Sequence, residues 1–278
     1  MPPTNQEACE ISGENYAYLQ QQVYRSSGIV LDENKRYLLE ARLTPIVRRE
    51  NLKSINDLCA LLRATSQPRI TQEITEAMTT NETFFFRDMT PFKILKEKIL
   101  PTLIEERKSS RQLSFWSAAA SSGQEAYSLA MMLLEMGLKD WKLDIFGTDI
   151  AEKVLERARG GKYIQIEVNR GLPAPYLVKY FNRQGLEWQV KDELRRMVRF
   201  QQFDLRQPMR SLGPFDVVLC RNVLIYFDIE TKKKILRQIE GTLRRGGCLL
   251  LGAAETTMNL DSSLERQVVD GGAFYAKK

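Results

Sequence analysis

From residue 113 onward, short apolar runs alternate with segments whose apolar residues recur at helical spacing. The runs have the texture of strands, and they lie at 113–117, 143–148, 200–203, 215–219 and 248–251. Between or after them lie helical segments at 125–136, 151–158 and 229–243. This alternation predicts an α/β fold with a mainly parallel sheet that is covered by helices on both faces.

The region before residue 78 has helical spacing and no strand signal. Asp32 is predicted to cap one of its helices, and Ser54 is predicted to cap the next. The sequence therefore predicts an all-helical N-terminal domain at 1–77, a linker at 78–90 and a second domain at 91–278.

One part of the second domain, at about 162–198, breaks the alternation and contains prolines at 173 and 175. Residues 186–190 alternate like a strand, and 196–198 have the texture of another short strand. We interpret this part as a small antiparallel insert. Near the end of the chain, the Asp-Gly-Gly sequence at 270–272 between apolar runs predicts a hairpin over 266–276.

The composition limits the possible chemistry. The chain has 278 residues and no histidine, which excludes imidazole as a base, a relay or a metal ligand. Its four cysteines show no CxxC spacing, so neither a disulfide framework nor a metal site is expected. Residues 1–15 do not resemble a signal peptide, and no apolar run approaches the ~20 residues that cross a bilayer. We therefore expect a soluble, cytoplasmic protein.

The net charge of +6 predicts an acidic partner, or simply a soluble basic surface. Lys35, Arg42 and Arg49 are seven residues apart and form one stripe on a predicted helix, with Arg36 and Arg48 beside it. The stripe is either a solvated face or an electrostatic docking site for an acidic helix.

Polar residues follow the apolar run at 215–219: Arg221, Asn222 and Tyr226. Ligands of open α/β sheets bind beyond the carboxyl ends of the strands, so this cluster is a candidate site. The alternative is an ordinary loop between a strand and a helix.

The loop after the run at 113–117 is built from small residues and contains a single glycine, Gly123. Small residues allow a ligand to approach the backbone, but the loop lacks the glycine pattern of a diphosphate cradle. A ligand without phosphates is therefore favoured. Glu125, in the first turn of the next helix, either attracts a cationic group of that ligand or compensates the helix dipole.

Asp149 ends the run at 143–148 and is placed either to bind both hydroxyls of a ribose or to cap the helix that follows. Asp204 and Leu205 end the next run and are candidates for contact with an adenine ring, or plain loop residues. A ribose-binding acid, a loop that tolerates a cation and the lack of a phosphate cradle together point to S-adenosylmethionine.

Three consecutive phenylalanines at 84–86 precede Arg87. They predict a dry wall, that is, a water-excluding aromatic surface that holds one fixed cation. They also predict a seam, or interface, between the two domains.

Four segments together resemble the chemotaxis receptor methyltransferase (CheR) family: TNETFFFR at 80–87, WSAAASSGQEAYS at 116–128, TDI at 148–150 and CRNVLIYF at 220–227. The resemblance implies a Rossmann-like methyltransferase domain with a β-subdomain, preceded by a helical receptor-recognition domain. It also implies methyl transfer from S-adenosylmethionine to glutamate side chains on the cytoplasmic part of methyl-accepting chemotaxis receptors. S-adenosylhomocysteine is the other product.

The resemblance also assigns roles to residues. Arg87 and Tyr226 match positions beside the transferred methyl group. The positions that match cofactor contacts are Asn81, Thr83, Arg87, Glu125, Asp149, Asp204, Leu205, Arg221 and Asn222. The basic stripe would contact the acidic methylation helices. In some relatives the β-subdomain holds a receptor tail peptide, but its turn at 182–185 is short here, which predicts binding without that tether.

Two other functions remain possible at this point. A nucleic-acid methyltransferase would share the cofactor residues, although no motif for a base-flipping pocket is present. A non-catalytic receptor-binding module would keep the fold without the activity. We expect a protein that binds no nucleic acid, does not insert into membranes and is a monomer.

Overall fold

The computed structural model describes residues 11–260, 262–269 and 271–278. These residues divide into two compact units. One contains the residues up to Thr80 together with Tyr226–Asp228, and the other contains Asn81–Ile225 and Ile229–Lys278.

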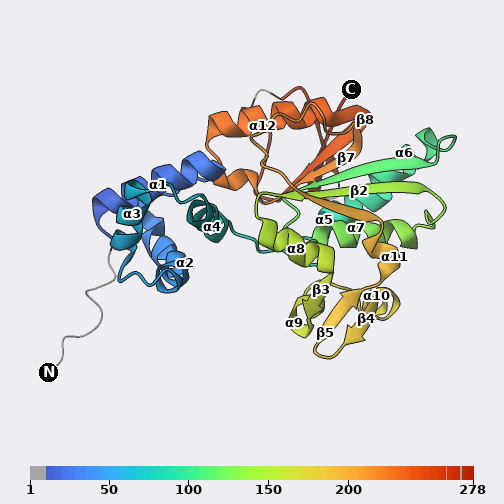
Figure 1. Ribbon diagram of the computed structural model, residues 1–278. Helices are drawn as coiled ribbons and strands as arrows, with labels where there is room; N and C mark the ends of the chain where they lie inside the picture. The colour runs from blue at the N-terminus through green and yellow to red at the C-terminus, as the bar shows by residue number, and fades with distance from the viewer. Residues whose placement is uncertain (1–10, 261, 270) are drawn as a thin grey trace. The chain divides into compact units, whose positions relative to one another are not determined.

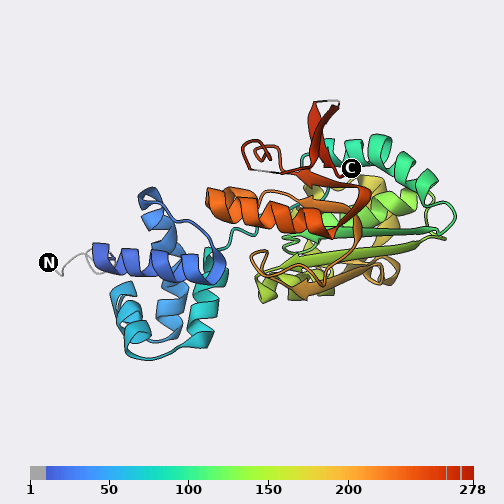
Figure 2. The same ribbon diagram turned by 90° about the horizontal axis from the view of Figure 1, so that it is seen from above.

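The first unit is all helical, as predicted: α1 (Gly13–Ser27), η1 (Glu33–Lys35), α2 (Arg36–Arg49), α3 (Ile55–Ala64) and α4 (Pro68–Met78). Its helices pack around a shared core of fully buried residues that includes Leu19, Leu39 and Leu58 (Figures 1 and 2). Ser54 caps α3, since its hydroxyl accepts a hydrogen bond from the Asp57 backbone N–H.

The predicted cap at Asp32 is wrong. Its side chain makes no capping bond to the 3₁₀ turn η1, and α2 begins only at Arg36. The Asp32 carboxylate instead lies 3.3 Å from the Lys35 ammonium, so a local ion pair has replaced the cap.

Residues from late in the chain complete the helical unit. The Val30 backbone N–H donates to the Tyr226 carbonyl at 2.9 Å, and the Tyr24 hydroxyl donates to an Asp228 carboxylate oxygen at 2.7 Å. The Tyr226 side chain packs against the core of this unit.

The second unit contains a seven-stranded sheet in the order β6-β2-β1-β7-β8-β10-β9. The strands are β1 (Gln112–Ala118), β2 (Lys142–Asp149), β6 (Val198–Gln202), β7 (Phe215–Cys220), β8 (Leu243–Leu251), β9 (Glu265–Val269) and β10 (Gly272–Ala276). The strands from β6 to β8 pair in parallel, and β10 and β9 add an antiparallel hairpin at one edge. This order is Rossmann-like and confirms the predicted fold class.

Helices cover both faces of the sheet: α5 (Thr90–Ile94), η2 (Leu95–Ile99), α6 (Leu100–Glu106), α7 (Gln124–Glu135), α8 (Glu152–Gly160) and α12 (Ile229–Thr242). From β1 the chain winds outward through β2, and from β7 it winds the opposite way through β8. Because crossovers are right-handed, α7 and α12 lie on opposite faces (Figure 1).

The insert forms a separate sheet in the order β3-β5-β4, as predicted. It comprises β3 (Lys162–Ile164), α9 (Gln165–Asn169), α10 (Ala174–Tyr180), β4 (Phe181–Gln184) and β5 (Glu187–Val190), and α11 (Asp192–Arg195) follows. The strand predicted at 196–198 as part of this insert is wrong, since Val198 begins β6 and pairs with Ile145 of the main sheet. The turn between β4 and β5 is also tighter than predicted, because Gln184 already pairs with Glu187.

Among the described residues, no helix is both long enough and apolar enough to cross a membrane.

Candidate active site at the carboxyl edge of the sheet

The candidate site lies where the direction of winding reverses, between β1 and β7. Ala118 pairs with Thr148 of β2 on one side and with Cys220 of β7 on the other, so the three strands end at one level. The loops that follow these strands carry most of the residues predicted from the sequence. In open α/β sheets this crevice is the usual place for a ligand.

The loop after β1 turns sharply before α7. Ala119, Ser121 and Gly123 all have positive φ, at 68°, 49° and 93°. A Cβ on Gly123 would lie 2.9 Å from the Cβ of Ala158, closer than real Cβ contacts allow. Position 123 therefore requires glycine for both its φ and its space, and the loop is held tightly against the α8 layer.

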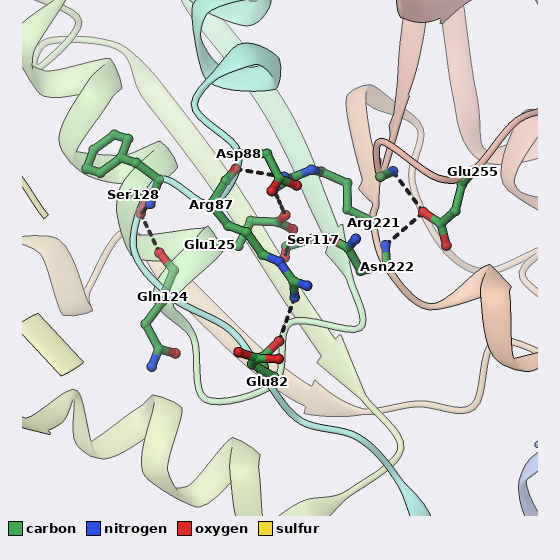
Figure 3. Close-up of polar contacts among 12 residues, drawn as sticks. Glu82, Arg87, Asp88, Ser117, Gln124, Glu125, Ser128, Arg221, Asn222 and Glu255 are labelled. Carbon is green, nitrogen blue, oxygen red and sulfur yellow. Dashed lines mark hydrogen bonds and ion pairs between the residues drawn. The ribbon is translucent and has the colours of Figure 1, made fainter. Parts of the chain in front are cut away.

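Glu125 is engaged by two neighbours at the start of α7. Its Oε1 accepts a hydrogen bond from the Ser117 hydroxyl at 2.7 Å, and its Oε2 lies 2.8 Å from Nη1 of Arg221 (Figure 3). Nη2 of Arg221 donates to the Arg87 carbonyl at 2.7 Å and to an Asp88 carboxylate oxygen at 2.8 Å. One guanidinium thus joins α7, the end of β7 and the segment that carries Arg87.

The Arg221 side chain is 1% exposed. Its Nε is buried and has no hydrogen-bond partner among the residues that the structure describes. A buried donor without an acceptor is costly, so a ligand carboxylate would stabilise it. The methionine end of S-adenosylmethionine carries such a group, and the site therefore fits this cofactor.

Asp149 bridges the loops after β1 and β2. Its Oδ2 accepts from the Ser121 backbone N–H at 2.9 Å, and its Oδ1 accepts from the Ala151 N–H at 3.0 Å. The predicted capping role is wrong, since Ala151 is the N-cap residue of α8, which begins at Glu152, and no side chain caps it. A carboxylate offers about four acceptor positions, so these bonds are compatible with a further role toward ribose hydroxyls.

The segment before α5 crosses the site in an unusual backbone conformation. Phe86, Asp88 and Met89 have positive φ, at 51°, 66° and 46°, which is strained for such side chains. The Phe86 backbone N–H donates to the Ser128 hydroxyl of α7 at 2.9 Å. Strain that is held in place by tertiary bonds is typical of functional segments, and Arg87 lies within it.

The guanidinium of Arg87 is partly exposed. Its Nη1 donates to the Glu82 carbonyl at 2.6 Å, and its centre lies 5.5 Å from the centroid of the Phe84 ring. Arg170 also covers that ring, at 4.3 Å, and its hydrogen bond to Glu82 holds the pKa of that carboxyl below its usual value. Arg87 keeps further donors for an incoming anion.

Of the three phenylalanines, Phe85 and Phe86 are buried within the core of the second unit. Phe85 packs edge-to-face on Tyr163 and Phe181 of the insert, and Phe86 packs on Phe92 and Tyr176. Phe85 and Phe86 thus belong to a buried aromatic cluster, whereas the ring that the Arg87 guanidinium covers is that of Phe84.

The remaining predicted cofactor residues lie around the same edge. The Asn81 carbonyl accepts from the Ser121 hydroxyl at 2.8 Å, and Thr83 is half-buried. Leu205 is buried. The Asp204 carboxylate is held by Arg206, whose Nη2 lies 2.6 Å from Oδ2, so any contact of Asp204 with adenine would be made beside an existing ion pair.

Glu255 also lies at this edge of the sheet, and it was not predicted from the sequence. Its carboxylate accepts a hydrogen bond from the backbone N–H of Asn222 at 2.7 Å (Figure 3). It also accepts from the backbone N–H groups of Val223 at 2.9 Å and Leu224 at 2.7 Å. An available signal was the glycine and glutamate three residues apart, directly after the run at 248–251.

The basic residues of the helical unit have mixed surroundings. Arg42 donates to the carbonyls of residues 77–79 and so caps α4. Arg36 lies 5.2 Å over the Tyr16 ring, and Arg49 pairs with Glu50 and Glu73. Lys35 pairs with Asp32, and Arg48 is exposed. The five cations therefore do not form a uniform solvated face.

Comparison with known proteins gives one consistent result. A family model described as the SAM-binding domain of CheR methyltransferases matches residues 81–270, and one described as their all-alpha domain matches residues 14–79. Chemotaxis protein methyltransferase 1 of Pseudomonas aeruginosa is 40% identical over 91% of the chain and 94% of its own length. The chemotaxis protein methyltransferase of Vibrio parahaemolyticus is 38% identical over 98% of the chain and 99% of its own length.

Proposed function

Since the chain belongs to the CheR methyltransferase family and is an S-adenosylmethionine-dependent methyltransferase of chemotaxis, we propose that it methylates glutamate side chains of chemotaxis receptors. A glutamate oxygen bonds to the methyl carbon while the carbon–sulfur bond breaks, which gives a methyl ester and S-adenosylhomocysteine. The observation that carries this proposal is Arg87, a partly exposed cation that lies over the Phe84 ring beside the buried Arg221 network.

The acceptor chemistry agrees with the composition. A glutamate carboxylate has an ordinary pKa of about 4.3 and is already anionic near neutral pH. The transfer therefore needs no general base, and the chain contains no histidine. What the protein must supply is alignment of the two reactants and exclusion of water.

We assign those tasks to named residues. Arg87 orients the incoming carboxylate, and Tyr226 lines the methyl-transfer site. The cofactor is held by Asn81, Thr83, Arg87, Glu125, Asp149, Asp204, Leu205, Arg221 and Asn222. Arg221 and Glu125 bind each other, so they act on the cofactor as one unit.

We propose that residues 1–77 recognise the cytoplasmic domain of the receptor, that 78–90 contribute to the cofactor site and that 91–278 perform the transfer. Lys35, Arg36, Arg42, Arg48 and Arg49 would face the acidic methylation helices. The two-residue turn after β4 supports docking that does not depend on a receptor tail peptide. We expect the protein to act as a cytoplasmic monomer.

The test is incubation with methyl-tritiated S-adenosylmethionine and membranes that carry chemoreceptors. Label on receptor-sized bands that is released as methanol in mild base identifies a carboxyl methyl ester and supports the proposal. Retained cofactor binding without label on receptors would contradict it, and label on added nucleic acid would favour the nucleic-acid methyltransferase instead.

A further inference from the structure

One carboxylate ties together the ends of two neighbouring strands. Glu255 lies just after β8, and its Oε2 accepts from the Gly252 N–H at 2.8 Å and from the Asn222 N–H at 2.7 Å. Its Oε1 accepts from the N–H groups of Val223 at 2.9 Å and Leu224 at 2.7 Å. The side chain thus fixes the backbone beyond β7 from the adjacent strand.

The groups that Glu255 binds would otherwise lack partners. Val223 and Leu224 lead into the 3₁₀ turn η3 (Leu224–Tyr226), whose first N–H groups have no partner within the turn. A carboxylate at such a position is favoured by both its charge and its acceptor oxygens. Asn222 has a φ of 59°, so the chain also adopts a left-handed conformation at the residue next to Arg221.

The approach of the two strand ends is close. A Cβ on Gly252 would lie 2.7 Å from Oε2 of Glu255 and 2.8 Å from the Asn222 backbone nitrogen. Any side chain at position 252 would therefore push the carboxylate or the loop away. The glycine and the glutamate together define the path of residues 222–225.

We propose that Glu255 is a positioning residue for the cofactor: its carboxylate sets the backbone from which the side chains of Arg221 and Asn222 reach the cofactor site. Arg221 in turn holds the Arg87 carbonyl, so the effect extends to the segment before α5. The inference rests on the cofactor roles proposed for Arg221 and Asn222, and it does not depend on glutamate being the methyl acceptor.

Glu255→Gln tests this inference at nearly constant shape. The amide replaces one acceptor oxygen with a donor that faces backbone N–H groups, so the loop loses at least one of its bonds. We expect the Kd for S-adenosylhomocysteine, measured by calorimetry without receptor, to rise at least tenfold, and the KM for S-adenosylmethionine to rise more than kcat falls. The matched control is Glu105→Gln, an exposed carboxylate far along the sequence, which should leave both unchanged.

A merely structural role would give a different result. If Glu255 only stabilises the fold, Glu255→Gln would lower the melting temperature and the number of binding sites per protein. The Kd of the folded fraction would stay at the wild-type value, and that result would overturn the proposal. If Glu255→Gln does not fold, Glu255→Asp provides the test. Its carboxylate is one methylene shorter, so the Kd for S-adenosylhomocysteine should rise at least threefold. A wild-type Kd would overturn the proposal. If Glu255→Gln raises the Kd as expected but the wild-type protein does not label receptors, the result contradicts only the proposal that receptor glutamates accept the methyl group.

Discussion

Charged side chains are organised in opposite ways at the carboxyl edge of the sheet and along α2. At the sheet edge, Arg221 is buried and binds Glu125, Asp88 and the Arg87 carbonyl at 2.7 to 2.8 Å. Along α2, Arg49 is exposed and its partners, Glu50 and Glu73, lie at the surface of the same unit. The first arrangement fixes the positions of atoms, whereas the second leaves charges in water.

This difference suits two tasks. Methyl transfer requires the reacting atoms to be closely aligned, which a buried network of hydrogen bonds and ion pairs provides. Docking on an acidic partner requires charge near the surface, where salt screens it and side chains adjust.

The largest effect is expected for Arg221→Ala. The change leaves Glu125 without its buried partner, and breaking a buried pair costs about 3–5 kcal/mol of unfolding free energy. Urea unfolding followed by circular dichroism measures it. The control is Arg199→Ala, which removes an exposed two-bond pair with Asp144 and should cost about 1 kcal/mol or less. Equal costs for the two variants would remove the distinction between buried and exposed charge.

Gly123→Ala tests whether the loop after β1 is rigid. We expect a loss of about 1–3 kcal/mol in unfolding free energy and a Kd for S-adenosylhomocysteine raised roughly tenfold, because the new methyl group overlaps Ala158. Gly137→Ala is the matched control, since Gly137 also has a positive φ, 80°, but nothing lies within 4 Å of its Cβ position. A loop that yields freely would give the two variants the same stability and the same Kd.

Arg87 lies between the two extremes, because its carbonyl is bound by Arg221 while its guanidinium is partly exposed. Arg87→Ala should lower kcat with saturating cofactor roughly 100-fold, because the incoming carboxylate loses the group that orients it. Arg170→Ala, which removes the other cation over Phe84, should change kcat little. A kcat near the wild-type value for both Arg87→Ala and Tyr226→Phe would contradict the roles proposed for those residues.

The smallest effect is expected on the basic stripe. Arg48→Glu should raise the KM for receptor membranes roughly two- to fivefold at low salt, and the difference should shrink as salt is added. Lys98→Glu changes the net charge equally in the second unit and should leave the KM unchanged. A Lys98→Glu effect as large as that of Arg48→Glu would indicate attraction by net charge alone.

The contrast also marks what could be predicted from the sequence. Strand and helix alternation placed the parallel sheet, and it placed Arg221 and Asp149 at its carboxyl edge, because both signals are local. The bonds of Arg221 to Asp88 and of Glu255 to Asn222 join residues far apart in the chain, which no local pattern reveals. Without that information, Glu125 was interpreted either as a partner for a ligand cation or as compensation for the helix dipole, whereas its Oε2 pairs with Arg221.

The errors have a similar origin. Residues 196–198 were assigned to the insert because a three-residue alternation carries no information about which sheet it joins, and β6 pairs with β2 instead. Asp32 satisfies a capping rule, but the ion pair with Lys35 competes for its side chain. The turn of the predicted hairpin at 266–276 includes residue 270, which lies outside the described residues, although β9 and β10 pair as expected.

The helical unit contains Tyr226–Asp228, and this has a consequence for synthesis on the ribosome. Translation adds about 5–20 residues per second, so residues 226–228 appear roughly 7 to 30 s after residue 80. During that interval the Val30 N–H and the Tyr24 hydroxyl lack the partners that they have in the finished protein. The nascent helical unit is therefore incomplete at first. Its hydrogen bonds to Tyr226 and Asp228 form only after most of the methyltransferase domain has left the exit tunnel.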